Sequence, residues 1–343
     1  MALDLRQLRY FVAVAEEGHI TRAAQRLGMQ QPPLSQQIKA LEGQLGVQLF
    51  WRKARGVELT ESGQVLLAEA QVILARLEQV ERATLSTARG EQGKLRVGVA
   101  PTAPFHPFVP GVIRAFRQAF PSVEITLDEC PSRQAVQGLK EARLDVAFVR
   151  AELADFEVTM HRLFEEPMVV AVPAGHALAQ QLGAEPHPLS VFAQESFIAF
   201  ARVEGPGMFD ATVAACLRAG FTPRLGQEAP RITSTLGLVA AGLGVAIVPA
   251  SISRIAMDGV AYCELLPAER PSAPLHLATR RGASSPVLRN FADLVRRTAR
   301  NVKGVQRGGT GCVRPLPKVM AHEQKSLWSG RQRVSERTNA RAV

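Results

Sequence analysis

A short polar series at the start of a predicted helix carries the side chains best suited to recognising another molecule. A glutamine amide can pair with adenine, a hydroxyl can donate or accept, and a lysine can reach guanine or a phosphate. The residues of these types are Gln31, Ser35, Gln36 and Lys39. In a helix-turn-helix, this end of the second helix lies nearest the bases of DNA. The same side chains would suit the solvent-exposed face of an ordinary helical bundle, so spacing alone leaves both interpretations open.

The helix that carries this series is predicted from its apolar spacing. Pro32 and Pro33 can open it, because a missing N–H costs nothing in the first turn. Four apolar residues then fall on one side at 100° per residue, in a narrow stripe that we expect to be buried: Leu34, Ile38, Leu41 and Leu45. Gln36 and Lys39 point the opposite way, so burial of the stripe would turn both side chains toward solvent.

Two shorter helices before this one and a hairpin after it complete the predicted first domain, residues 1–59. The first helix ends at Gly18. Thr21 is predicted to be the N-cap of the second helix, which ends at Gly28. After the third helix, residues 48–52 and 57–59 are typical of two short strands, and the turn between them is basic.

A long helix is predicted for residues 60–88, which contain no proline. Five apolar residues recur in steps of four and three, as in a heptad seam between two helices: Leu66, Ala70, Ile73, Leu77 and Val80. We therefore expect residues 60–89 to form a dimerisation helix. An amphipathic helix packed on its own domain would give the same pattern. Residues 89–93 are typical of a linker.

Residues 94–302 alternate short apolar segments with helical ones, which favours α/β units with a largely parallel sheet. Predicted strands cover 95–100, 123–127, 146–150, 168–172 and 245–248, and a further strand ends near Phe200. Predicted helices cover 112–120, 133–141, 208–219, 234–241 and 287–300. About 200 residues are enough for two small lobes rather than one large sheet.

The composition excludes several classes of protein. Hydrophobic residues make up 46% of the 343 residues, enough for a sizeable core. No apolar segment reaches the roughly 20 residues of a membrane span, and charged residues among the first nine argue against a secretory signal. The four cysteines have no C-x-x-C spacing, which argues against a zinc site and a disulfide framework. We expect a cytoplasmic protein without a metal or cofactor.

The net charge of +10 is concentrated at one end of the chain. Residues 303–343 alone carry +7, whereas residues 1–60 carry +3. The end segment has no periodicity and few large apolar residues, so we predict a disordered basic tail. A high isoelectric point is therefore weak evidence for a folded nucleic-acid-binding surface.

The first 63 residues closely resemble the winged helix-turn-helix of LysR-type transcriptional regulators. The opening LRQLRYFVAVAEE is similar to the first helix of that family. The matching residues that follow are Ala23, Ala24, Leu27, Gln31, Pro32, Leu34, Ser35, Ile38, Leu41, Glu42, Leu45, Gly46, Leu49, Phe50, Arg52, Thr60 and Gly63. Gln36 departs from the family, in which many members have Arg. The segments ARLDVAFVR and LGLVAAGLGVAIVPAS resemble regulators of aromatic-compound catabolism.

The resemblance implies an all-α winged helix-turn-helix, a long linker helix and a two-lobed α/β effector domain like that of periplasmic binding proteins. The implied partners are double-stranded promoter or operator DNA, a small inducer, a second or further copies in a homodimer or homotetramer, and RNA polymerase. The residues assigned to DNA binding are Thr21, Arg22, Gln31, Pro32, Ser35, Gln36, Lys39, Arg52, Lys53 and Arg55.

The resemblance also implies that the inducer lies between the two lobes, at strand ends and helix starts, where free N–H groups favour anions. The residues that match by position are Pro101, Thr102, Ser132, Arg150, Phe200 and Arg202. Helix capping is the alternative for Thr102 and Ser132, and a surface ion pair is the alternative for the two arginines. We therefore expect a transcriptional activator that responds to a small carboxylated inducer.

An enzyme is the weaker interpretation. The chain has no G-x-S-x-G, G-x-x-x-x-G-K-[ST] or H-E-x-x-H motif, and we assign no catalytic residue. A small-molecule-binding protein without sequence-specific DNA binding is the stronger alternative, because residues 94–302 alone would suffice for it.

Overall fold

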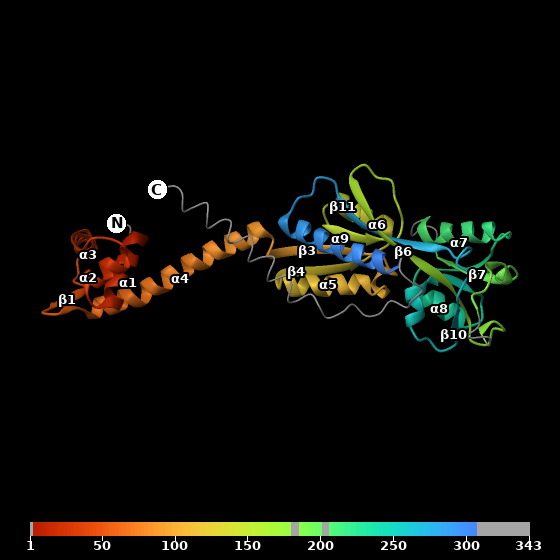
Figure 1. Cartoon of the computed structure of the whole chain (residues 1–343), viewed down its shortest axis with the longest axis horizontal. Coiled ribbons are helices and arrows are strands. Elements are labelled where there is room, and N and C mark those ends of the chain that lie inside the picture. Colours follow the sequence, from red (N-terminus) through yellow and green to blue (C-terminus); the bar gives the residue numbers. More distant parts are fainter. Residues whose placement is uncertain (1–2, 180–184, 201–205, 307–343) are drawn as a thin grey trace. The chain divides into compact units, whose positions relative to one another are not determined.

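The computed structural model describes residues 3–179, 185–200 and 206–306 (Figure 1). The chain divides into two compact units, Met1–Arg89 and Gly90–Val343. After the roles that the resemblance to the LysR family implies, we call the first the DNA-binding unit and the second the effector unit.

The DNA-binding unit consists of three short helices, a two-stranded hairpin and one long helix. Their bounds are α1 (Leu5–Glu17), α2 (Ile20–Arg26), α3 (Gln31–Leu45), β1 (Phe50–Lys53), β2 (Gly56–Leu59) and α4 (Glu61–Arg89). Apolar residues from all three short helices meet β1 in one core, in which Phe11, Leu34 and Leu49 are almost fully buried. The antiparallel hairpin β1–β2 is the wing.

Two details of this unit differ from the sequence prediction. The N-cap of α2 is His19 rather than Thr21, because the His19 Nδ1 accepts the N–H of Thr21. Leu45 is 38% exposed, so the buried stripe of α3 ends at Leu41. A histidine ring nitrogen is an uncommon cap, and the usual list of capping residues does not include it.

The effector unit contains two lobes. The strands and helices that build the first lobe are β3 (Gln92–Val99), η1 (Ala103–Phe105), α5 (Phe108–Ala119), β4 (Ser122–Glu129), α6 (Ser132–Lys140), β5 (Val146–Val149) and α9 (Pro286–Gln306). The second lobe is built from η3 (Leu189–Phe192), β7 (Ser196–Phe200), α7 (Pro206–Arg218), β8 (Arg224–Ala229), α8 (Ile232–Ala240), β9 (Ala246–Pro249), η5 (Ala250–Arg254) and β10 (Val260–Cys263). Two long strands belong to both lobes, β6 (Val158–Pro173) and β11 (Ser272–Arg280).

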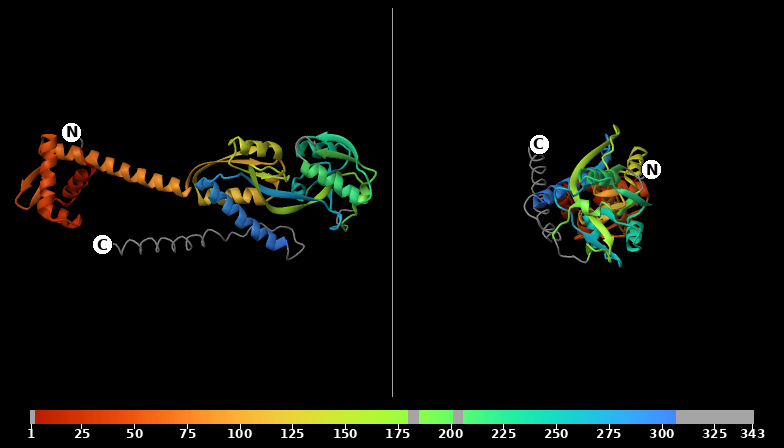
Figure 2. Two further views of the ribbon diagram at one scale, coloured as in Figure 1. Left: turned by 90° about the horizontal axis from the view of Figure 1, so that it is seen from above. Right: turned by 90° about the vertical axis from the view of Figure 1, so that its right-hand side faces the viewer.

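The two lobes share one sheet through these long strands (Figure 2). Strand β11 pairs with β5 and with β6, up to Pro167 of β6, and the later part of β6 pairs with β9 and β10. All of these pairings are antiparallel, whereas β3–β4, β3–β5 and β7–β8 are parallel. The prediction of a largely parallel sheet was therefore wrong, because spacing along the chain does not reveal the direction of a distant partner.

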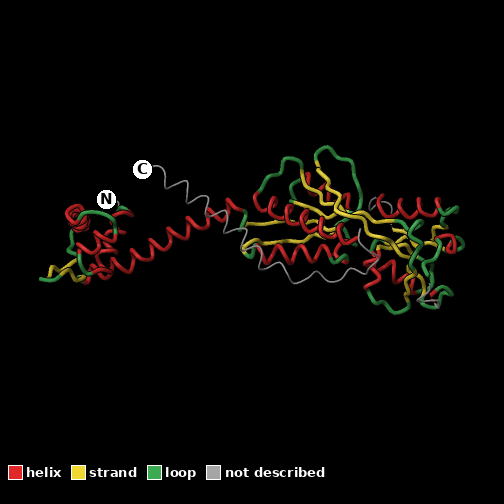
Figure 3. The backbone as a smooth tube through the Cα atoms, viewed as in Figure 1, coloured by secondary structure: helices red, strands yellow, loops and turns green. Residues whose placement is uncertain are grey.

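Helices cover both faces of the first-lobe sheet (Figure 3). Helices α5 and α9 pack against one face with Phe116 and Phe291 in edge-to-face contact, and α6 packs against the other. In the second lobe, α7 and α8 contribute to two separate apolar clusters. Strands β8, β10 and β11 and the first half of β6 were not predicted.

The predicted linker at residues 89–93 is much shorter in the structure, because α4 extends to Arg89 and β3 begins at Gln92. Gly90 is buried at a positive φ of 69°, and a Cβ there would collide with the backbone of Pro286. Only glycine fits such a position without strain. At the other end, α9 continues to Gln306, past the predicted boundary at residue 302. Within the described residues, no helix has an apolar stretch long enough to cross a bilayer.

Candidate functional site

The polar series on α3 lies on the side of the helix that faces solvent. Gln31, Pro32, Gln36 and Lys39 are exposed and Ser35 is half-buried, while Leu34, Ile38 and Leu41 are buried on the opposite side. The apolar stripe therefore fixes the rotation of the helix about its axis. On α2, Thr21 and Arg22 are exposed, and Arg22 donates to the Glu17 carbonyl oxygen.

The wing presents its basic residues on a short hairpin. Arg52 pairs in register with Val57 and Lys53 with Gly56, so Arg55 lies in the turn between the strands. All three basic residues of the wing, Arg52, Lys53 and Arg55, are exposed. The Lys53 Nζ lies 2.9 Å from the Glu58 carboxylate, an exposed pair that contributes little to stability.

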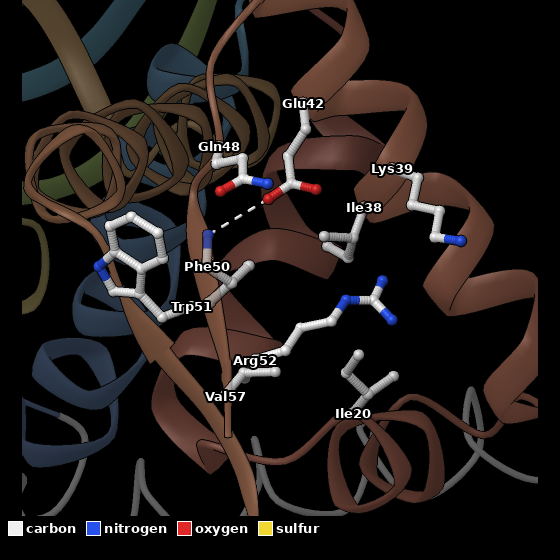
Figure 4. Close-up of a pocket in the computed structure, with 9 residues that line it drawn as sticks. All are labelled: Ile20, Ile38, Lys39, Glu42, Gln48, Phe50, Trp51, Arg52 and Val57. Atoms are coloured by element: carbon white, nitrogen blue, oxygen red, sulfur yellow. Dashed lines mark hydrogen bonds between the residues drawn. The ribbon is translucent and has the colours of Figure 1, made fainter. Parts of the chain in front are cut away.

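A hollow of about 470 Å³ separates the wing from α3 (Figure 4). Figure 4 shows Arg52 extending from β1 across this hollow, while the Lys39 ammonium points away from the strand. Both cations line it, together with Ile20, Ile38, Glu42, Gln48, Phe50, Trp51 and Val57. The unit thus offers two basic elements, helix and wing, on either side of one concavity.

The residues of the predicted seam on α4 do not share one environment. Leu66 packs against the core of its own DNA-binding unit, and Ala70 is fully buried in the same chain. Ile73 is 43% exposed and Val80 is 51% exposed, with Leu77 half-buried between them. The alternative of packing on the same domain therefore applies to the first turns of α4, and only the later residues are open to a partner. Val65 and Val72 form a second exposed apolar side.

A pocket in the effector unit gathers five of the six residues predicted to bind the effector: Pro101, Thr102, Ser132, Arg150 and Phe200. Arg202 lies outside the described residues. We call this the effector pocket. The lining also includes Pro131, which precedes Ser132 in the stretch matched by position. Sequence reasoning missed the other residues, which are mostly apolar: Ala100, Ala151, Gly207, Met208, Phe209, Pro230 and Ile232. Several of these residues stand at strand ends and helix starts, the same positional signal that identified Thr102 and Ser132.

The two hydroxyl residues of the pocket make no capping hydrogen bond. Thr102 is the N-cap residue of η1, but it is 3% exposed and its side chain donates to and accepts from no backbone group of that helix. Ser132 is 6% exposed and is the first residue of α6, where its Oγ accepts the N–H of Arg150 at 3.0 Å. Neither hydroxyl therefore caps its helix. Both hydroxyls are buried at the pocket, where each retains hydrogen-bonding capacity.

Arg150 is held in a buried ion pair rather than a surface one. Its Nη2 lies 2.6 Å from the Glu166 carboxylate and its Nη1 donates to the Ala273 carbonyl oxygen at 3.3 Å. The other Glu166 oxygen accepts the N–H of Ser251 at 2.7 Å. Burial lowers the pKa of the Arg150 guanidinium, and the Glu166 carboxylate opposes that shift. The pocket therefore contains a cation whose charge is already neutralised.

His106 lies beside this ion pair. Its ring stacks against Phe164 with centroids 4.6 Å apart, and its Nδ1 accepts the N–H of Phe108 at 3.2 Å. Burial lowers the pKa of His106 to about 4, a shift that Arg150 and Arg254 reinforce and Glu166 opposes. His106 is therefore neutral at physiological pH.

Two family models match the chain. The model "Bacterial regulatory helix-turn-helix protein, lysR family" covers residues 5–64, and "LysR substrate binding domain" covers residues 88–300. The regulator TfdS of Cupriavidus pinatubonensis is 37% identical over 86% of this chain and 98% of its own length. AlsR of Bacillus subtilis is 35% identical over 84% and 94%. The chain belongs to the LysR family of bacterial transcriptional regulators, and it is not an enzyme.

Solved structures give the same assignment. The LysR family regulator CbnR matches with a TM-score of 0.78 at 30% identity, over 86% of this chain and all of that one. CbnR in complex with its target DNA matches with a TM-score of 0.74 at 30% identity, over 87% of this chain and all of that one. The effector-binding domain of BenM with its effector benzoate matches with a TM-score of 0.54 at 27% identity, over 64% and 95%. The first unit is thus a DNA-binding domain, and the second is a domain that binds small molecules. The alternative without DNA binding is excluded.

Proposed function

We propose that this regulator binds its operator through the exposed face of α3 and the basic wing, and that a small carboxylate in the effector pocket controls it. The observation that carries the effector assignment is the pair of buried hydroxyls of Thr102 and Ser132, in a lining that is mostly apolar apart from Arg150, which is paired with Glu166. A pocket of this kind fixes one polar end of a ligand and surrounds the rest with apolar side chains.

The pocket favours an anion held by neutral donors. The guanidinium of Arg150 is neutralised by Glu166, so the remaining donors are the two hydroxyls and the free N–H groups in the first turn of α6. Phe200, Met208 and Phe209 can contact the body of the ligand. BenM, whose effector-binding domain has a related fold, takes benzoate. We infer that the inducer here is also an aromatic or similarly apolar carboxylate, as in regulators of aromatic-compound catabolism.

A ligand of this size requires the pocket to widen. The cavity measures about 70 Å³, whereas a cavity of about 150 Å³ accommodates benzene. Thr102 and Ser132 belong to the first lobe, and Phe200 and Ile232 to the second, so widening changes the spacing of the two lobes. A ligand that prefers the wider form shifts the population toward it, and this shift is the proposed inducer response.

We propose that the protein acts as a homodimer or a homotetramer, with Ile73, Leu77 and Val80 of α4 in the contact between copies. A two-fold dimer places one α3 in each operator half-site. RNA polymerase stays an expected partner on the family resemblance alone.

The effector assignment is tested by a thermal-shift screen of aromatic and dicarboxylic acids, followed by calorimetry. Ser132→Ala and Thr102→Val should each weaken binding of the selected acid by about tenfold, because a charged ligand loses a hydrogen bond worth about 1–3 kcal/mol. Ser253→Ala is the matched control, since Ser253 is exposed and lies outside the pocket. If both pocket variants bind the acid normally, the pocket is not the effector site.

A further inference from the structure

The first residues of the wing are bonded to the recognition helix by a single carboxylate. We call residues 48–50 the wing root. The Oε1 atom of Glu42, near the end of α3, accepts the N–H of Leu49 at 2.9 Å and the N–H of Phe50 at 3.2 Å. Figure 4 shows the Glu42 side chain turned toward the backbone of Phe50. These two N–H groups are therefore bonded to a side chain of α3 and not to another strand.

A second side chain holds the wing root from the opposite side. The Thr60 Oγ1 donates to the Gln48 carbonyl oxygen at 2.8 Å, and the Thr60 N–H donates to the Leu49 carbonyl oxygen at 3.0 Å. Gly63 allows this approach, because a Cβ there would collide with the Leu49 carbonyl oxygen. Because Leu49 and Phe50 are buried, the backbone groups of these two residues depend on such partners within the protein. The hairpin thus leaves its root in one fixed direction.

The negative charge of Glu42 is unfavourable for DNA binding, so its presence beside the wing calls for another explanation. It lines the same hollow as Lys39 and Arg52, on the side of the unit that we propose to face DNA phosphates. Among the ion pairs within the described residues, none involves Glu42. A carboxylate near a phosphate backbone repels it. Both of its hydrogen bonds to the wing root go to one oxygen, and the amide oxygen of a glutamine could occupy the same position.

We propose that Glu42 is a positioning residue for DNA recognition: it fixes the distance between the reading face of α3 and the basic wing, so that both reach the same duplex. This proposal rests on the proposed docking of α3 and the wing. With the root fixed, Arg52 and Arg55 of the wing and Gln36 of α3 bind with little further loss of conformational freedom. Without the hydrogen bonds of Glu42 to the wing root, the wing adopts several directions, and its contact with DNA contributes little to the binding free energy.

Three substitutions of Glu42 separate the effect of side-chain length from the effect of its charge. Glu42→Gln keeps an oxygen at the same distance and removes the charge. Glu42→Asp keeps the charge but is one methylene too short, and Glu42→Ala removes both. The full-length protein is measured by fluorescence anisotropy against a duplex that it has selected from a random-sequence pool, and against a scrambled duplex. We expect Gln to bind within twofold of wild type, and Asp and Ala to bind the selected duplex about tenfold more weakly.

The readout specific to positioning is the coupling to Arg55. Arg55→Ala should weaken binding about tenfold in the wild-type and Glu42→Gln backgrounds, but less than twofold in the Glu42→Asp and Glu42→Ala backgrounds, because the wing contact is already lost there. Gln36→Ala should keep its full effect in all backgrounds. If Glu42→Ala impairs folding, the comparison is made with Glu42→Asp, which is the smaller change.

Each outcome separates this inference from the proposed docking. An Arg55→Ala effect that is equal in every background overturns the positioning role, while the docking of the wing still holds. Loss of binding in Glu42→Gln together with normal binding in Glu42→Asp assigns Glu42 to direct reading of a cytosine amine and also overturns it. No effect of Arg55→Ala or Gln36→Ala on the wild-type protein rejects the proposed docking itself.

Discussion

Buried polar groups are partnered differently in the two units. At the wing root of the DNA-binding unit, Glu42 and Thr60 provide partners for the backbone groups of residues 48–50. In the effector unit, four buried polar atoms have no hydrogen-bond partner among the described residues: Arg150 Nε, Ser251 Oγ, and both ring nitrogens of His276. Buried polar groups are normally hydrogen-bonded. The DNA-binding unit thus satisfies the polar groups of the wing root within its own fold, whereas the effector unit has buried polar atoms without an internal hydrogen bond.

This contrast has a functional meaning. A DNA-binding unit gains from rigidity, because its contacts with DNA then form at little entropic cost. A sensor must instead have a second state close in free energy to the first.

Removing Glu166 should destabilise the effector unit strongly. Glu166→Ala leaves the Arg150 charge buried without a partner and also frees the N–H of Ser251, at an expected cost of about 3–5 kcal/mol. Urea unfolding of the full chain measures the change. Glu124→Ala is the control, since its pair with Lys94 is exposed and is worth at most about 1 kcal/mol. Equal effects of the two substitutions would contradict the importance assigned to the buried pair.

Acid should weaken the effector unit through His106. Its pKa falls from 6.5 to about 4 on folding, so the unfolded chain binds more protons between these two values. Stability is then fully present above pH 6.5 and is lost as the pH falls toward 4, by at most about 3 kcal/mol. His106→Leu should flatten this loss in unfolding curves measured at several pH values. His161→Gln, at an exposed position, should leave it unchanged; equal slopes for all three proteins would rule out His106.

The exposed seam on α4 should respond more modestly. Ile73→Glu places a charge in the proposed contact between copies and should raise the dimer dissociation constant at least about tenfold, or 1.4 kcal/mol. Val72→Glu is the matched control, because Val72 is adjacent in sequence, exposed, and turned to the other side of the helix. Sedimentation that shows dissociation for Val72→Glu alone would move the contact to that second side.

Local patterns predicted the local parts of the structure. The stripe of Leu34, Ile38 and Leu41 follows from helical periodicity, and it is enough to turn Gln36 toward solvent. This periodicity depends only on residues within a turn or two of each other. The resemblance to the LysR family supplied the rest of the assignment. It implied an inducer site at strand ends and helix starts, and Thr102 and Ser132 line one pocket at such positions.

Long-range partners could not be predicted in this way. Glu166 and Arg150 are both charged residues next to apolar strands, and nothing in their local sequence shows that they are buried against each other. Strand β11 pairs with β6 across more than a hundred residues of chain, and its antiparallel direction has no local signature. The contact of Glu42 was hidden for a similar reason, because the N–H groups that donate to it, those of Leu49 and Phe50, lie beyond the turn that ends α3.

The two strands shared by the lobes restrict how the effector unit can deform. Where β6 and β11 pass from one lobe to the other, Pro167 pairs with Ser272 and Pro274 pairs with Glu165. Proline contributes no N–H to a ladder, so this stretch has fewer hydrogen bonds than the sheet on either side. Two adjoining strands with a weakened stretch at the same level act as a flexure: they bend about one axis more easily than they shear or twist. We expect the lobes to open about this bend, and the effector pocket lies close to it, because Arg150 of the pocket is bonded to Glu166 and Ala273 in the same stretch.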